Sequence, residues 1–152
     1  MRVHRFETAT VLRVPRERVF PFFADAANLE RITPPELRFR IVTPLPIEMR
    51  EGALITYRLR LFGIPFAWHT RITTWDPPHA FVDEQIRGPY RQWIHRHTFE
   101  ASAEGTVMRD TVDYGLPLYP FGEISAPIVA WQVARIFKYR ASVIAGLFRR
   151  SR

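Results

Sequence analysis

The chain has no cysteine and only one lysine, and none of its apolar runs approaches the length of a membrane-spanning segment. Without cysteine it cannot form a disulfide, use a thiol nucleophile or bind a metal through thiolates. A transmembrane helix needs about 20 consecutive apolar residues, so no such helix is expected. The first residues, Met1–Phe6, show no apolar core followed by a cleavage site. A cytoplasmic protein is therefore expected.

The scarcity of lysine leaves the basic charge of the chain to arginine. Lys138 is the only lysine among 22 basic side chains, and the formal net charge is +7. The arginines are scattered, apart from a cluster at Arg149, Arg150 and Arg152. A nucleic-acid-binding protein would gather them in a stripe or a motif, so we expect no specific nucleic-acid partner. Attraction to anionic surfaces, including peripheral contact with a membrane, stays open.

The chain has the size and composition of one domain over residues 1–152. Apolar residues make up 47% of the sequence and 12 phenylalanines supply bulk for a core. The sequence has no glycine-rich phosphate loop, and its serines lack the elbow motif of a nucleophile. We therefore expect no cofactor and no serine-type hydrolase.

The order of expected elements is a strand, two short helices, six strands and a long helix. Pro15 suits the first turn of a helix and Asp25 suits an N-cap. The segments are Val3–Val14 for the first strand, Arg16–Phe23 and Asp25–Ile32 for the helices, then strands over Leu37–Val42, Ala53–Phe62 and Phe66–Trp75, a hairpin over Phe81–Phe99, a strand over Thr106–Tyr114 and a helix over Glu123–Phe148.

This order predicts an α+β fold in which one curved, seven-stranded antiparallel sheet wraps around the C-terminal helix. Strands separated by Gly and Pro turns at these intervals are typical of an antiparallel meander. The last helix carries an apolar stripe at spacings of three and four, formed by Val129, Val133, Ile136, Phe137, Ile144 and Leu147. That stripe is expected to cover one face of the sheet.

The hairpin holds the candidate functional residues. Trp93, His95, His97 and Phe99 alternate strictly, so both histidines point to the same face as the bulky rings. A three-residue connection, Gly88–Tyr90, would pair Asp83 with His95 and Gln85 with Trp93 on that inner face. A two-residue turn would bring Val82 and Glu84 there instead, because a slip of one residue exchanges the faces. We favour the three-residue connection.

The whole ordered pattern resembles the START-like (SRPBCC) superfamily, the helix-grip group that includes the birch-pollen allergen, aromatic polyketide cyclases and lipid-transfer domains. The residues that carry the resemblance are Val19–Phe20, Asn28–Leu29, Leu37–Phe39, Gly52, Ile55, Tyr57–Leu59, Trp68, Thr70–Ile72, Trp75–Pro78, Phe81–Gln85, Gly88–Tyr90, Trp93, His95, His97, Phe99, Gly105–Thr106, Met108, Asp110, Tyr114, Ile136–Phe137 and Tyr139–Arg140. The resemblance implies a hydrophobic cavity between the sheet and the C-terminal helix. It implies no particular reaction, because the superfamily includes binders, carriers and enzymes.

The expected cavity would hold two polar pairs, Asp83 with His95 and His97 with Asp110. These pairs are interpreted either as groups that orient a ligand and move protons, or as a buried core whose polar groups satisfy one another. The candidate ligand-binding residues are Tyr57, Trp68, Asp83, Gln85, Trp93, His95, His97, Asp110, Tyr114 and Phe137. His95, His97, Asp83 and Asp110 are also the candidates for catalysis, and Arg140 is a candidate partner of an inward carboxylate.

Three functions remain open at this point. The favoured one is binding of a small hydrophobic molecule; the others are a cyclase/dehydratase-type enzyme using the inward His and Asp residues, and an interaction module. The two histidines could also bind zinc or iron with Asp83 or Asp110 as a third ligand, but no further histidine stands near them, so we expect no metal. His4, His69 and His79 are interpreted as incidental.

Overall fold

The computed structural model describes residues 1–150. Seven strands form one antiparallel sheet in the spatial order β1-β7-β6-β5-β4-β3-β2. The strands are β1 (Val3–Leu12), β2 (Arg40–Ile41), β3 (Leu54–Leu61), β4 (Ile64–Asp76), β5 (Ala80–Arg87), β6 (Gln92–Ser102) and β7 (Gly105–Gly115). The predicted α+β helix-grip fold is thus confirmed.

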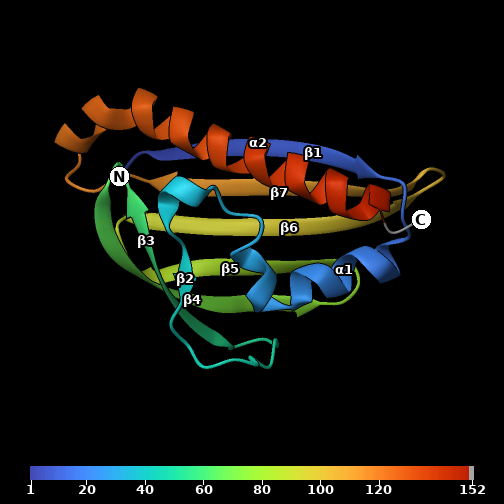
Figure 1. Cartoon of the computed structure of the whole chain (residues 1–152). Helices are drawn as coiled ribbons and strands as arrows, with labels where there is room; N and C mark the ends of the chain where they lie inside the picture. The colour runs from blue at the N-terminus through green and yellow to red at the C-terminus, as the bar shows by residue number, and fades with distance from the viewer. Residues whose placement is uncertain (151–152) are drawn as a thin grey trace.

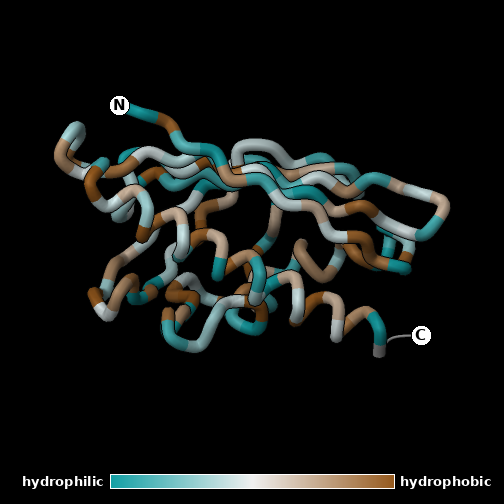
Figure 2. Tube along the Cα trace, turned by 90° about the horizontal axis from the view of Figure 1, so that it is seen from above, coloured by the Kyte–Doolittle hydropathy of each residue, from teal (hydrophilic) through white to brown (hydrophobic). Residues whose placement is uncertain are grey.

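The helices lie on one face of this sheet. The long helix α2 (Ala126–Arg150) crosses the strands in front of β1 and β7, and α1 (Arg16–Ala24) lies over the other half of the sheet (Figure 1). Seen from above, sheet and helices form two layers (Figure 2). Val133, Phe137 and Ile144 of the predicted apolar stripe are buried. No helix within residues 1–150 is long and apolar enough to cross a membrane.

The short helices follow the expected order with shifted ends. Asp25 caps η1 (Ala26–Leu29) as predicted, accepting a hydrogen bond from the backbone N–H of Ala27 at 3.1 Å. This segment is a 3₁₀ helix and ends before Ile32. The C-terminal helix begins three residues later than predicted, because a separate 3₁₀ turn, η3 (Phe121–Ser125), precedes it.

The predicted strand over Leu37–Val42 is mostly wrong. Leu37 belongs to η2 (Pro35–Leu37), a 3₁₀ turn with proline at its start, and the strand is limited to the two residues of β2. Proline favours the first turn of a helix. Arg38 then adopts a left-handed backbone conformation with φ of 47°, which breaks any strand at that point.

The apolar side chains between the two layers form three clusters. The first surrounds Phe20 and Phe99 beneath α1, the second surrounds Trp68 and Phe137 beneath α2, and the third surrounds Ile72 towards the side of the sheet formed by β3 and β2. The candidate site lies where these three clusters meet.

Candidate functional site

A cavity of about 110 Å³ lies between the sheet and α2. Residues of all three apolar clusters form its wall, among them Phe81, Trp68 and Ile72. Its polar atoms come from few side chains: the Tyr57 hydroxyl bonds the Thr70 hydroxyl at 3.0 Å, and the histidine–aspartate cluster and Arg140 lie further along the wall. An apolar wall with few placed polar groups is typical of small-molecule sites.

The structure brings most, but not all, of the sequence-predicted residues to this cavity. Those that line it are Tyr57, Trp68, Asp83, Trp93, His95, His97 and Phe137. Gln85, Asp110 and Tyr114 do not. Asp110 lies behind the two histidines, and Tyr114 is buried in the second cluster, where His4 stacks on its ring at 5.3 Å.

The hairpin adopts the register that places both histidines inside. Asp83 pairs with His95 across β5 and β6, and Phe81 pairs with His97. The predicted inward face is therefore confirmed for these residues. The connection is one residue longer than predicted, since β5 ends at Arg87 and β6 begins at Gln92, and the ladder stops at the Glu84–Ile94 pair.

Gln85, which was predicted to bind ligand on the inner face, is not among the residues that line the cavity and supports the turn. Its side-chain amide donates to the Tyr90 carbonyl at 2.7 Å, and its side-chain oxygen accepts from the Tyr90 N–H at 3.1 Å. These two bonds hold the connecting segment so that the buried Tyr90 ring lines the cavity. Sequence reasoning missed Tyr90 because alternation assigns no face to a residue between two strands.

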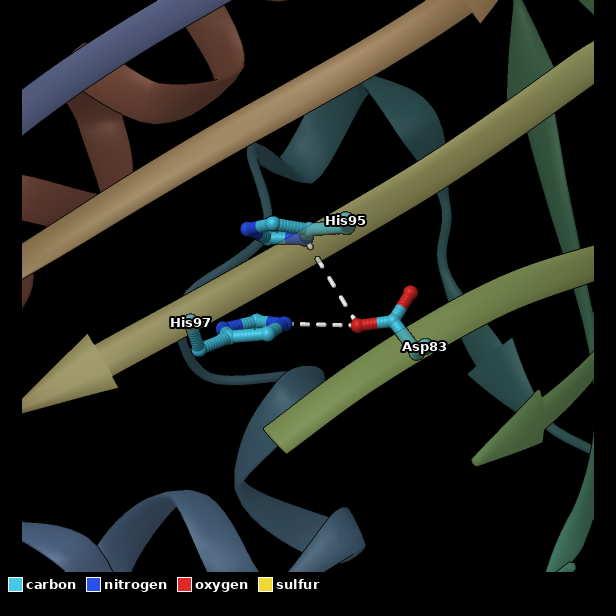
Figure 3. Close-up of side chains that lie close together, drawn as sticks. All are labelled: Asp83, His95 and His97. Atoms are coloured by element: carbon cyan, nitrogen blue, oxygen red, sulfur yellow. Dashed lines mark hydrogen bonds and ion pairs between the residues drawn. The ribbon is translucent and has the colours of Figure 1, made fainter. Parts of the chain in front are cut away.

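Two histidines and two aspartates form a closed cluster at one side of the cavity. The shortest contacts run diagonally: His97 Nε2 lies 2.6 Å from Asp83 Oδ2, and His95 Nε2 lies 2.7 Å from Asp110 Oδ1. The directly opposed contacts are longer, at 3.7 Å for His95 with Asp83 and 3.4 Å for His97 with Asp110. Each carboxylate thus touches both rings, and Figure 3 shows Asp83 facing the two histidines. The predicted pairs, Asp83 with His95 and His97 with Asp110, do lie opposite each other in the strand register. The short hydrogen bonds, however, join Asp83 to His97 and Asp110 to His95.

Burial and neighbouring charges set the protonation states of this cluster. Burial raises the pKa of Asp83 and Asp110, but the histidines and Arg140 outweigh it, so both carboxyl pKa values fall below their ordinary value. Burial and the charge of the neighbouring His95 lower the pKa of His97 to about 4, although the two carboxylates act to raise it. At neutral pH, ionised carboxylates can only accept hydrogen bonds, so Nε2–H of His97 donates to Asp83.

Arg140 of α2 brings a positive charge to the cavity without a short ion pair. Its charge lowers the pKa of both Asp83 and Asp110, yet no carboxylate among residues 1–150 lies within 4.0 Å of it. The predicted direct pairing is therefore absent from the described chain. Its guanidinium carbon lies 4.9 Å over the Phe137 ring, and its buried Nε has no hydrogen-bond partner.

Asp83, His95 and His97 have the composition of a metal site. One ligand atom from each lies within 4.8 Å of the other two. However, the imidazole rings stack with centroids 3.6 Å apart and planes 29° apart, so their nitrogen lone pairs run side by side. An ion bound by both rings must lie near both ring planes, and these rings would have to turn first. The geometry present fits a hydrogen-bonded cluster better.

Two of the three remaining histidines make side-chain contacts with other elements. His4 bonds Glu123 at 2.7 Å and joins β1 to η3, and His69 Nδ1 lies 3.1 Å from the Thr56 hydroxyl on the neighbouring strand. His79 is exposed in the β4–β5 turn. His4 and His69 thus have structural contacts that their sequence positions did not indicate.

Solved structures of similar shape share the fold at low sequence identity. The protein TTHA0849 from Thermus thermophilus is 16% identical, with a TM-score of 0.75 and 99% of each chain covered. The ZhuI aromatase/cyclase from Streptomyces sp. R1128 is also 16% identical, with a TM-score of 0.78 and coverage of 98% and 95%. Ginseng major latex-like protein 151 from Panax ginseng is 10% identical, with a TM-score of 0.66 and coverage of 96% and 97%. No curated protein matches.

The sequence itself matches a family model over most of its length. The match covers residues 12–140, from the end of β1 to the middle of α2, and includes the whole cavity wall. The model describes polyketide cyclases, dehydrases and lipid-transport proteins. The chain therefore belongs to the polyketide cyclase/dehydrase and lipid transport family of START-like proteins.

Proposed function

We propose that the protein binds a small, largely hydrophobic molecule in the cavity between the curved sheet and α2. The observation that carries this proposal is the cavity itself, with aromatic walls and polar groups at fixed positions. A core packed only for stability leaves few voids larger than a water molecule. The cavity, which is partly open to solvent, has a volume of about 110 Å³, somewhat smaller than an engineered cavity of roughly 150 Å³ that binds benzene. A single ring is therefore the natural size of ligand for the cavity itself, and a larger one would extend through its opening or displace side chains.

Blocking the cavity from α2 tests this proposal. Ile136 lines the cavity, so an Ile136→Trp variant is expected to bind the probe p-cresol at least about tenfold more weakly, because the indole fills the space. Isothermal titration calorimetry gives the affinity. Ala134→Trp places the same side chain on the exposed face of the same helix and should bind like the unmodified protein. Native mass spectrometry of protein from its own host would identify a co-purifying ligand. Absence of p-cresol binding, or equal binding by both variants, would contradict the proposal.

Proton transfer on a polyketide-like substrate is a second candidate function. It is favoured by His97, which lines the cavity, is neutral at neutral pH and is held by Asp83. A carboxylate that orients an imidazole is a common feature of general base catalysis. Incubation with a poly-β-ketone substrate separates the two functions: an enzyme yields a cyclised or dehydrated product that His97→Gln abolishes, and a binder returns the substrate unchanged.

A further inference from the structure

Six large apolar side chains are exposed in one segment that follows β7 and runs into the first turns of α2. Their exposed fractions run from 53% for Ile128 to 86% for Ile124. We call this segment, residues 118–131, the apolar tip; its exposed members are Leu118, Tyr119, Phe121, Ile124, Ile128 and Trp131. None of them lines the cavity, and the tip lies at the end of the molecule where β1 begins (Figure 1).

The positions of the exposed side chains on α2 show that they form a surface separate from the buried face of this helix. Ile128 and Trp131 are three residues apart on α2, on the face opposite the buried Val133 and Phe137. The same helix thus covers the core with one face and presents a second apolar face outward. A cluster of large exposed apolar side chains is unusual on a protein without a partner, and it marks a contact surface.

The apolar tip is almost free of charge. Glu123 is the only charged residue between Leu116 and Ala134. Its carboxylate bonds His4 at 2.7 Å, and only 18% of its side chain is exposed. The tip can therefore enter an apolar medium without taking an exposed ionic group with it, which would be costly.

Basic residues flank the start of the tip. Gly115 pairs with Val3, and its carbonyl accepts a hydrogen bond from the Arg91 N–H at 2.9 Å. The exposed Arg2 and Arg91 are therefore held next to the point where the segment leaves the sheet. Arg91 also shares a surface depression with Leu118 and Tyr119.

We propose that the apolar tip docks on an anionic phospholipid surface. The apolar side chains would enter the interface, where aromatic residues such as Tyr119, Phe121 and Trp131 are favoured. The flanking arginines and the net charge of +7 would be attracted to acidic headgroups. The same net charge opposes association of the tip with a second copy of the chain, because both copies are positive.

This docking goes beyond the proposed ligand binding and has a consequence for it. The helix that begins in the tip carries Ile136, Phe137 and Arg140 to the cavity wall. Docking through its first turns would hold the cavity at a fixed distance from the bilayer. The two proposals fail separately, because p-cresol binding requires no membrane and vesicle binding requires no occupied cavity.

Vesicle flotation tests the docking. The full chain is expected to float with vesicles of phosphatidylcholine containing about one-third phosphatidylserine, and much less with phosphatidylcholine alone. Leu118→Asp and Ile124→Asp should each weaken binding about tenfold or more, because a carboxylate replaces an inserted apolar group. Leu54→Asp makes the same change at an exposed leucine of β3 and should bind normally. Tryptophan fluorescence should shift to shorter wavelength on binding, and Trp131→Phe should remove that shift.

Several results would overturn the proposal. They are failure of the unmodified protein to float, equal binding to phosphatidylcholine alone, or unaltered binding by both tip variants. A concentration-dependent dimer that Leu118→Asp dissociates would assign the tip to a second copy instead. The substituted side chains are exposed, so thermal unfolding should show that the variants remain folded.

Discussion

An Asp110→Ala variant is expected to lose about 3 to 5 kcal/mol of its free energy of unfolding at neutral pH. Asp110 is 4% exposed and accepts the 2.7 Å hydrogen bond from His95, while its second ring contact, to His97, is 3.4 Å. Removing the carboxylate leaves a buried N–H without an acceptor and takes away one of the two negative charges that face Arg140. Urea denaturation followed by fluorescence measures the change.

The same strand offers a matched control. Asp113 pairs with Arg5 at 2.7 Å on the solvent side of β7, where the arginine is 60% exposed. Asp113→Ala removes a carboxylate three residues away but should cost no more than about 1 kcal/mol, as is usual for surface ion pairs. Asp110→Asn keeps an acceptor and the shape, so it should fall between the two. Equal losses for Asp110→Ala and Asp113→Ala would contradict the interpretation of Asp110 as part of a tightly coupled buried cluster.

Strand periodicity explains why the inner face of the sheet was predictable. In Trp93, His95, His97 and Phe99 the side chains alternate, and a register error of one residue would have put both histidines into water. The burial of His95 and His97 at 4% and 5% exposure therefore confirms the pattern on which the sequence interpretation depended. The short strand β2 was not predictable in this way, because two residues carry no periodicity.

The details of the site depend on side-chain torsions and on loops, which periodicity does not describe. Backbone pairing places Asp83 opposite His95, yet the ring rotamers direct the short bond of His97 to Asp83. Gln85 has the correct spacing for the inner face but turns to the Tyr90 backbone, where two hydrogen bonds hold it. Both outcomes result from local hydrogen-bond competition, and the sequence carries no direct signal for them.

The free energy of unfolding of the metal-free protein is expected to fall as the pH drops from about 6.5 to 4. The pKa of His97 is about 4 in the folded protein and close to its ordinary 6.5 in the unfolded chain. Between these values the unfolded state binds more protons, so stability rises with pH in this window. The difference corresponds to roughly 3 kcal/mol, lost on acidification. Urea denaturation at a series of pH values measures it.

The carboxylates extend this acid sensitivity in the same direction. Asp83 and Asp110 have lowered pKa values when folded, so their stabilising contribution is present above the ordinary carboxyl range and is lost as the pH falls through the folded values. His97→Gln should flatten the profile between pH 4 and 6.5 but leave the loss below it, whereas His79→Gln, at an exposed position, should retain the whole slope. NMR titration of the His97 ring in the unmodified protein gives an independent test. A ring that takes up its proton near pH 6.5 would show that burial does not outweigh the two neighbouring carboxylates.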